Sequence, residues 1–378
     1  MKKETEIRQS NFELLRIIAM FMIVVTHIIN YGQVMQNSNR EVLSLIFDYI
    51  FCIIIVHVNS YILVTGYFQS KSKFKMSKVL KTINITWFYR IAMLIFLVLI
   101  KAWHPTHIEI FRHVFPLDLG FYWFIDVYIL LYCISPFLNI LIEKLDKKEF
   151  LRLIIILLII FSILPTITGL RFFQNNGYTL YNFVLLYFIG AYLREYPIRK
   201  SYLFKYVKKN AFQLICIISF LGLAFLNLLL YRFGEQISSY SNILAEIGNN
   251  ITTTTFFYSN PIIILQSICF FCFFETLDIK SSFINKIASL SLGVYLIHEH
   301  IQIRTSLYQL LKINDGPITS YHFIWYIFVI AVLIFVVCII IEWIRQIIFK
   351  FIYNRKLSQK FRIKYRSWIE DTGLKINW

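Results

Sequence analysis

An arginine and a histidine stand eleven residues apart inside a long apolar stretch near the start of the chain. Arg16 and His27 belong to residues 11–31, which read NFELLRIIAMFMIVVTHIINY. In a helix, this separation makes about three turns, so the two side chains share one face about 16 Å apart. Guanidinium binds anions, and imidazole exchanges protons near neutral pH. The spacing therefore predicts a helix face with an anion-binding group at one level and a general base at another.

Both residues also have a structural interpretation. An arginine inside a membrane-spanning helix costs about 2.5–3.5 kcal/mol on insertion scales, so Arg16 could instead extend to the headgroups. His27 could satisfy a neighbouring backbone carbonyl. Ionisable groups within a span usually face a bundle interior or a water-filled cavity. We therefore interpret the pair as a functional site.

The composition identifies the class of protein. Of the 378 residues, 58% are hydrophobic, 18% are aromatic and only 16% are charged, whereas about a quarter of a soluble domain is charged. Segments of about twenty apolar residues can cross a bilayer as helices. The sequence predicts an all-α fold, a polytopic membrane helix bundle of about ten transmembrane helices. The expected spans are residues 12–31, 43–67, 79–100, 118–142, 150–170, 180–195, 211–231, 254–275, 287–308 and 321–349.

The net charge of +17 follows the expected topology. With the N-terminus inside the cell, 29 of the 38 lysines and arginines fall in cytoplasmic segments, seven fall outside and two lie within spans. Cytoplasmic loops of membrane proteins carry such an excess. We therefore expect both termini in the cytoplasm and an attraction to anionic membrane lipids, and we expect no nucleic-acid partner.

One membrane domain is expected to fill most of the chain. Residues 1–350 hold the spans, and residues 351–378 alternate basic and aromatic side chains, which predicts a basic amphipathic cytoplasmic tail. The first apolar stretch is too long for a signal peptide and contains Arg16, so we expect it to be retained. We expect no appended soluble domain, so the helices and loops must carry any chemistry.

Two polar clusters and the cysteines each leave a choice between structure and function. His57, Asn59 and Ser60 form a polar set in the second span, for which helix–helix hydrogen bonding is the favoured interpretation. All six cysteines fall within expected spans, as small packing residues would. His298 and His300 alternate, and alternate residues on a helix point about 200° apart, so they could share an ion only if the helix broke. We expect no metal.

Five stretches along the chain carry distinctive patterns. FELLRIIAMFMIVVTHI has a basic residue, ten intervening residues and a histidine, and VNSYILVTGYF, YWFIDVYILLYCISPFLN, LLYFIGAYLREY and SLSLGVYLIHEH follow in that order. Together they resemble the acyltransferase-3 family. Members of that family are integral membrane enzymes that transfer acyl groups, usually acetyl, to surface polysaccharides, peptidoglycan, lipids or small molecules.

The chain also departs from the family pattern. Many members have Arg-x-x-Arg where this chain has Lys78 and Lys81, which keep the charge but lack the planar fork of guanidinium. Some members have an acidic pair where this chain has Tyr128 and Ile129, and the nearby acid here is Asp126. The two lysines also fit an ordinary cytoplasmic basic cluster.

The residues and the resemblance together predict three groups of site residues. The expected catalytic residues, with His27 as base and Asp126 orienting it, are His27, His298 and Asp126. The residues expected to bind the phosphates of the donor are Arg16, Lys78 and Lys81. The residues expected to bind the acceptor are Trp123, Tyr295 and Glu299.

The predicted function is transfer of an acetyl group from acetyl-CoA to a hydroxyl of a cell-surface polysaccharide or its polyprenol-linked precursor. The location is the plasma or inner membrane, and the interpretation allows a homo-oligomer. A transporter or flippase of lipid-linked saccharides is the alternative, which inverted repeats and discontinuous spans would favour. A polysaccharide polymerase would be expected to carry long outer loops with paired arginines, and the longest expected outer loop holds only Arg232.

Overall fold

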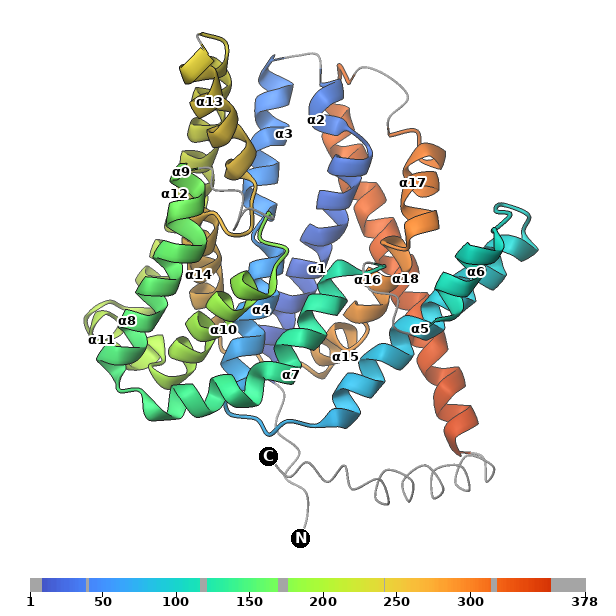
Figure 1. The fold of residues 1–378 in the computed structure, drawn as a ribbon, viewed down its shortest axis with the longest axis horizontal. Helices are drawn as coiled ribbons and strands as arrows, with labels where there is room; N and C mark the ends of the chain where they lie inside the picture. The colour runs from blue at the N-terminus through green and yellow to red at the C-terminus, as the bar shows by residue number, and fades with distance from the viewer. Residues whose placement is uncertain are drawn as a thin grey trace.

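The computed structural model describes residues 9–354 except 39–40, 116–120, 169–175, 241 and 314–317. Within these residues every regular element is a helix, and the helices form a bundle that α5 and α6 cross obliquely (Figure 1). The predicted all-α class is confirmed. Most of the expected amphipathic tail, residues 355–378, lies outside the described part of the chain.

Seven helical segments of the described chain are long and apolar enough to cross a membrane, so the chain is a multi-pass membrane protein. They are α1 (Ser10–Tyr31), α3 with α4 (Glu41–Ile54 and His57–Gln69), α5 (Met76–Leu99), α7 (Trp123–Lys144), α8 with η1 and α9 (Lys147–Leu158, Ile159–Ile163 and Leu164–Thr168), α12 (Lys209–Ser238) and α18 (His322–Asn354).

The expected count of about ten spans is not confirmed. Two further helices, α10 (Leu180–Glu195) and α14 (Pro261–Glu275), occupy expected spans but have only 16 and 15 residues. Helices of this length reach about 24 Å, whereas the apolar core of a bilayer is about 30 Å thick. Each helix is therefore shorter than the apolar core is thick.

The ninth expected span is not continuous. A single helix over 287–308 is the wrong expectation, because α16 (Ser291–His298) ends and α17 (Ile301–Leu310) begins three residues later. Around this break, His298, Glu299 and Arg304 all contact side chains of α1. A straight helix would turn adjacent members of this group to different faces. The break thus brings side chains from both sides of it against α1.

Shorter helices connect these segments. They are α2 (Val34–Asn37), α6 (His107–Val114), η2 (Ile198–Lys200), α11 (Tyr202–Tyr206), α13 (Asn242–Thr255) and α15 (Ser282–Ala288). One of them, α6, folds back along α5. There Trp87 Nε1 donates to the Val114 carbonyl at 2.6 Å. The Arg90 guanidinium likewise donates to the Arg112 carbonyl.

A close helix contact joins α4 to α10 through two glycines. A Cβ at Gly66 would lie 2.2 Å from the Tyr187 carbonyl oxygen, and one at Gly190 would lie 2.2 Å from that of Leu63. Small residues let membrane helices approach until their backbones touch. This contact fixes α4 against α10, and α4 also packs against α1.

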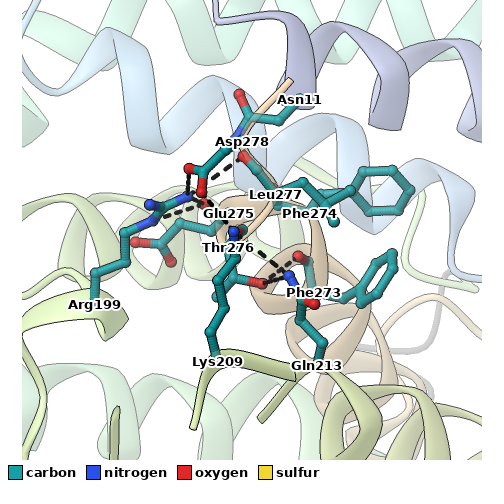
Figure 2. A network of polar contacts seen from close by, with 10 residues as sticks. All are labelled: Asn11, Arg199, Lys209, Gln213, Phe273, Phe274, Glu275, Thr276, Leu277 and Asp278. Carbon is teal, nitrogen blue, oxygen red and sulfur yellow. Dashed lines mark hydrogen bonds and ion pairs between the residues drawn. The ribbon is translucent and has the colours of Figure 1, made fainter. Parts of the chain in front are cut away.

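A polar network closes the end of α14 beside the start of α1. The last carbonyls of a helix have no partner within it. Arg199 covers them by donating to the Glu275 and Leu277 carbonyls, while Asn11 donates to the Phe274 carbonyl at 3.0 Å (Figure 2). Lys209 and Arg199 also donate to the Asp278 carboxylate, which lowers the pKa of that carboxyl. The network ties α1, α12 and α14 together at the end where α1 begins.

The glycine contact predicts a difference between two alanine substitutions. Gly66→Ala should destabilise the purified protein by about 1–3 kcal/mol, because the new methyl group overlaps backbone that cannot move freely. Gly222→Ala is the control, since a Cβ there meets nothing within 4 Å. Thermal unfolding in detergent measures both. Equal melting temperatures for the two variants would contradict the close α4–α10 contact.

Candidate active site

Two imidazole rings from distant parts of the chain meet between α1 and α16. His27 Nδ1 lies 3.0 Å from His298 Nε2. His298 Nδ1 lies 2.6 Å from the Val294 carbonyl oxygen, which can only accept. The His298 proton therefore sits on Nδ1, and its Nε2 accepts in the neutral ring. It follows that His27 donates from Nδ1 and that its Nε2 carries a free lone pair, as a general base requires.

A carboxylate stands beside the same nitrogen of His27. Glu299 Oε2 lies 3.0 Å from His27 Nδ1. The other oxygen, Oε1, accepts from the Tyr31 hydroxyl and from Arg304, each at 2.9 Å. Arg304 also donates to the Tyr31 oxygen at 3.2 Å and lies over its ring. The carboxylate is thus held by two donors on one side and directed at His27 on the other.

The local sequence explains how one short region assembles this site. Tyr31 follows His27 by four residues, so both side chains leave the same face of α1. His298 is the last residue of α16, and Glu299 lies in the break that follows it. Arg304 reaches back from the first turns of α17. The break therefore presents three polar side chains to a single face of α1.

The three residues around His27 Nδ1 differ in solvent exposure. His298 is 1% exposed and Glu299 is 4% exposed, whereas 15% of the His27 side chain is accessible. His27 is therefore the least covered of the three, while His298 and Glu299 are shielded by protein. In a low-dielectric environment such shielded polar contacts are stronger than in water.

The polar side chains of the second expected span, His57, Asn59 and Ser60, make contacts that join structural elements. Asn59 donates to the Tyr258 carbonyl at 2.9 Å, and Ser60 donates to the Val56 carbonyl at 2.8 Å. His57 Nε2 lies 3.1 Å from the hydroxyl of Thr26, the residue before His27. The set joins α4 to α1 and to the loop before α14 and thereby supports the position of His27.

The expected donor-binding residues lie toward the beginning of α1 and α5. Arg16 donates to Glu13 at 3.1 Å, and its guanidinium lies 6.0 Å from the centre of the Phe68 ring. Lys78 is exposed and lies over the Tyr132 ring. Lys81 is exposed. Arg16 and Lys78 thus have different neighbours, and their shared role stays a prediction.

The other expected residues lie at different distances from the two histidines. The Tyr295 ring centre is 6.3 Å from that of His298, and Trp123 belongs to an aromatic group described below. Asp126 occupies the first turn of α7, and its orienting role stays a prediction. Glu299 holds the position beside His27 Nδ1 that sequence reasoning gave to Asp126. Tyr31 was missed, although its spacing of four residues from His27 was a usable signal.

His300 faces away from this pair. Its ring lies 5.2 Å from the Phe121 ring and 5.6 Å from the His113 ring, measured between centres. Because the helix breaks before it, His300 and His298 enter different surroundings. Across the described residues, no three His, Cys, Asp or Glu side chains are grouped so as to hold a metal ion.

These observations define an integral membrane helix bundle whose buried polar site is suited to proton transfer. A family model described as an acyltransferase domain, Acyl_transf_3, matches residues 9–343. The chain belongs to this family, so the predicted resemblance is confirmed and the protein is a membrane acyltransferase. No curated protein and no solved structure matches the chain.

The position of Glu299 predicts a large effect of removing its charge. Glu299→Gln keeps the size but weakens the electrostatic hold on the His27 imidazolium, so acyl transfer should fall by about 100-fold or more. Glu235→Gln is the control, since Glu235 is an exposed acid paired with Arg232 on α12. Transfer rates of purified variants with matched melting temperatures give the comparison. Full activity in Glu299→Gln would remove the carboxylate from the mechanism.

Proposed function

We propose that the protein is an O-acetyltransferase of the cell membrane with both termini in the cytoplasm. It transfers the acetyl group of acetyl-CoA to a hydroxyl of a cell-surface polysaccharide or of its polyprenol-linked precursor. The observation that carries this proposal is the accessible His27, whose Nδ1 is engaged by His298 and whose Nε2 is left to accept a proton.

The proposed reaction needs one proton acceptor and a place for the positive charge that it gains. His27 Nε2 removes the proton of the acceptor hydroxyl while that oxygen attacks the thioester carbonyl. The C–O bond forms, the C–S bond breaks, and the proton on His27 passes to the departing thiolate of coenzyme A.

His298 and Glu299 support this cycle from the other side of the His27 ring. The imidazolium formed on His27 donates from Nδ1 toward the His298 nitrogen and faces the Glu299 carboxylate, both at 3.0 Å. A carboxylate beside a catalytic histidine orients the ring and stabilises its charged form. Tyr31 and Arg304 hold that carboxylate in place.

The donor is proposed to enter at the end of the bundle where α1 begins. A coenzyme that carries phosphates and cannot cross a bilayer must meet cations at the cytoplasmic surface. Arg16 stands on the same helix as His27, about 16 Å away along the axis. The extended pantetheine arm covers much of that distance, so Arg16 with Lys78 and Lys81 can hold the phosphates while the thioester approaches His27. Family membership favours this enzyme over the transporter alternative.

The first test replaces the proposed base. His27→Ala and His27→Gln should abolish acetylation of the surface glycan, because neither side chain can accept the hydroxyl proton. His322→Ala serves as the control, since that histidine is exposed at the start of α18. Mass spectrometry of the glycan from cells with equal membrane levels of each variant gives the result. Near-normal acetylation by His27→Ala would exclude His27 as the base.

The second test concerns the donor. Arg16→Ala should weaken acetyl-CoA binding more than Arg16→Lys, since lysine keeps the charge but not the fork. The double substitution Lys78→Ala/Lys81→Ala should raise the KM for acetyl-CoA and leave the acceptor KM unchanged. Arg152→Ala, an exposed arginine on α8, is the control. Calorimetry with acetyl-CoA compares the affinities, and unchanged affinity in all of these variants would place the donor elsewhere.

A further inference from the structure

Three aromatic side chains from separate elements meet near the start of α7. The Trp123 ring centre lies 4.2 Å from that of Tyr178 in an edge-to-face contact. Tyr258 lies roughly parallel to Trp123 at 6.1 Å and stands edge-on to Tyr178 at 5.3 Å. The group therefore contains two nearly parallel rings with a third ring set against both. We call Trp123, Tyr178 and Tyr258 the aromatic platform.

The two loops that carry the platform are fixed to each other. The Tyr258 amide donates to the Asn176 carbonyl at 3.0 Å, and Asn182 donates to the Gly177 carbonyl at 3.0 Å. Gly177 has φ of +81°, and a Cβ there would lie 2.7 Å from the Tyr258 side chain. Asn59 holds the Tyr258 carbonyl from α4. Hydrogen bonds and close packing thus hold Tyr178 and Tyr258 in place, and a preformed site lowers the entropy cost of binding.

Burial within the platform is uneven. Tyr258 is 6% exposed, whereas Tyr178 is 37% exposed and Trp123 is partly exposed. By contrast Phe183, which packs beside Trp123, is fully covered. Trp123 and Tyr178 therefore present accessible apolar surface, and Tyr258 supports them from behind.

The platform is continuous with the candidate active site. Ring contacts lead from Trp123 to Phe124 at 5.9 Å, from Phe124 to Tyr295 at 6.0 Å, and from Tyr295 to His298 at 6.3 Å. A second connection leads from Tyr258 to His57, whose other contact is Thr26. The Tyr295 hydroxyl is buried and has no hydrogen-bond partner. A polar ligand lying between the platform and His298 would supply one.

We propose that Trp123 and Tyr178 form a stacking subsite for a pyranose ring of the acceptor. This inference rests on the proposed function and assigns residues that hold one sugar ring of its saccharide acceptor. The C–H face of a pyranose packs on aromatic rings, while its hydroxyl groups stay at the edge for hydrogen bonding and reaction. A ring held there directs one edge toward Tyr295 and the two histidines.

Direct sugar binding tests the subsite without requiring acyl transfer. The probes are methyl β-D-glucopyranoside, methyl β-D-galactopyranoside and methyl N-acetyl-β-D-glucosaminide, with the protein in lipid nanodiscs. Saturation-transfer difference NMR should show contact at the ring C–H protons of at least one probe. Tyr178→Ala and Trp123→Ala should weaken that binding about threefold to tenfold, as expected for the loss of one aromatic contact.

Two further variants separate stacking from folding. Tyr178→Phe keeps the ring and should bind the sugar like the unmodified protein. Tyr240→Ala removes a tyrosine that is 67% exposed beyond the end of α12 and should also leave binding unchanged. Absence of binding by the unmodified protein to all three probes, or undiminished binding by Tyr178→Ala, would overturn the proposal.

Acetyl transfer measured on the same variants distinguishes failure of the sugar subsite from failure of the proposed function. Tyr178→Ala should raise the KM for the glycan acceptor and leave the KM for acetyl-CoA unchanged. Sugar binding that depends on Tyr178, in a protein that acetylates no glycan, would support the subsite and refute the proposed function. Glycan acetylation with an unchanged acceptor KM in Tyr178→Ala would support the function and refute the subsite.

Discussion

The hydrogen bond from His298 Nδ1 to the Val294 carbonyl sets the direction of the protons in the site. Because a carbonyl can only accept, the neutral His298 ring must accept at Nε2, and His27 must donate to it. The free lone pair of His27 then lies on its other nitrogen. The Val294 carbonyl, one helical turn before His298, thus determines which nitrogen of His27 can act as base. This carbonyl need not change during a reaction.

The buried carboxylate of Glu299 imposes the next constraint. A charge removed from water is tolerated when partners and hydrogen bonds compensate for its lost hydration. Tyr31 and Arg304 give that compensation at one oxygen, while His27 lies against the other. The same principle operates at the far end of α1, where Arg199 and Asn11 cover the carbonyls at the end of α14. Both ends of α1 are therefore fixed by polar groups in an otherwise apolar bundle.

The sequence was sufficient for the fold class and for the placement of Arg16 and His27 on one helix, because hydropathy and helical periodicity report these directly. It could not give the pairing of His27 with Glu299. Residues 287–308 contain neither proline nor glycine at the break, so nothing in their pattern marks the end of α16 at His298. His298, Glu299 and Arg304 contact α1 across a long separation in the chain, and a local sequence pattern does not report such contacts. For the same reason the platform residues Tyr178 and Tyr258, which belong to two distant loops, had no shared signal.

The continuity of α1 between Arg16 and His27 has a consequence for the choice of acyl group. No break or glycine interrupts these residues, so the separation of the two side chains is set by the helical rise and cannot adapt to the donor. With its phosphates held at Arg16, a donor would present its thioester carbon at one fixed height. Acyl chains of different length would differ only in what extends past that height, toward the partly exposed Tyr31 and the buried His298 and Glu299. The helix would thus act as a molecular ruler that favours short acyl groups.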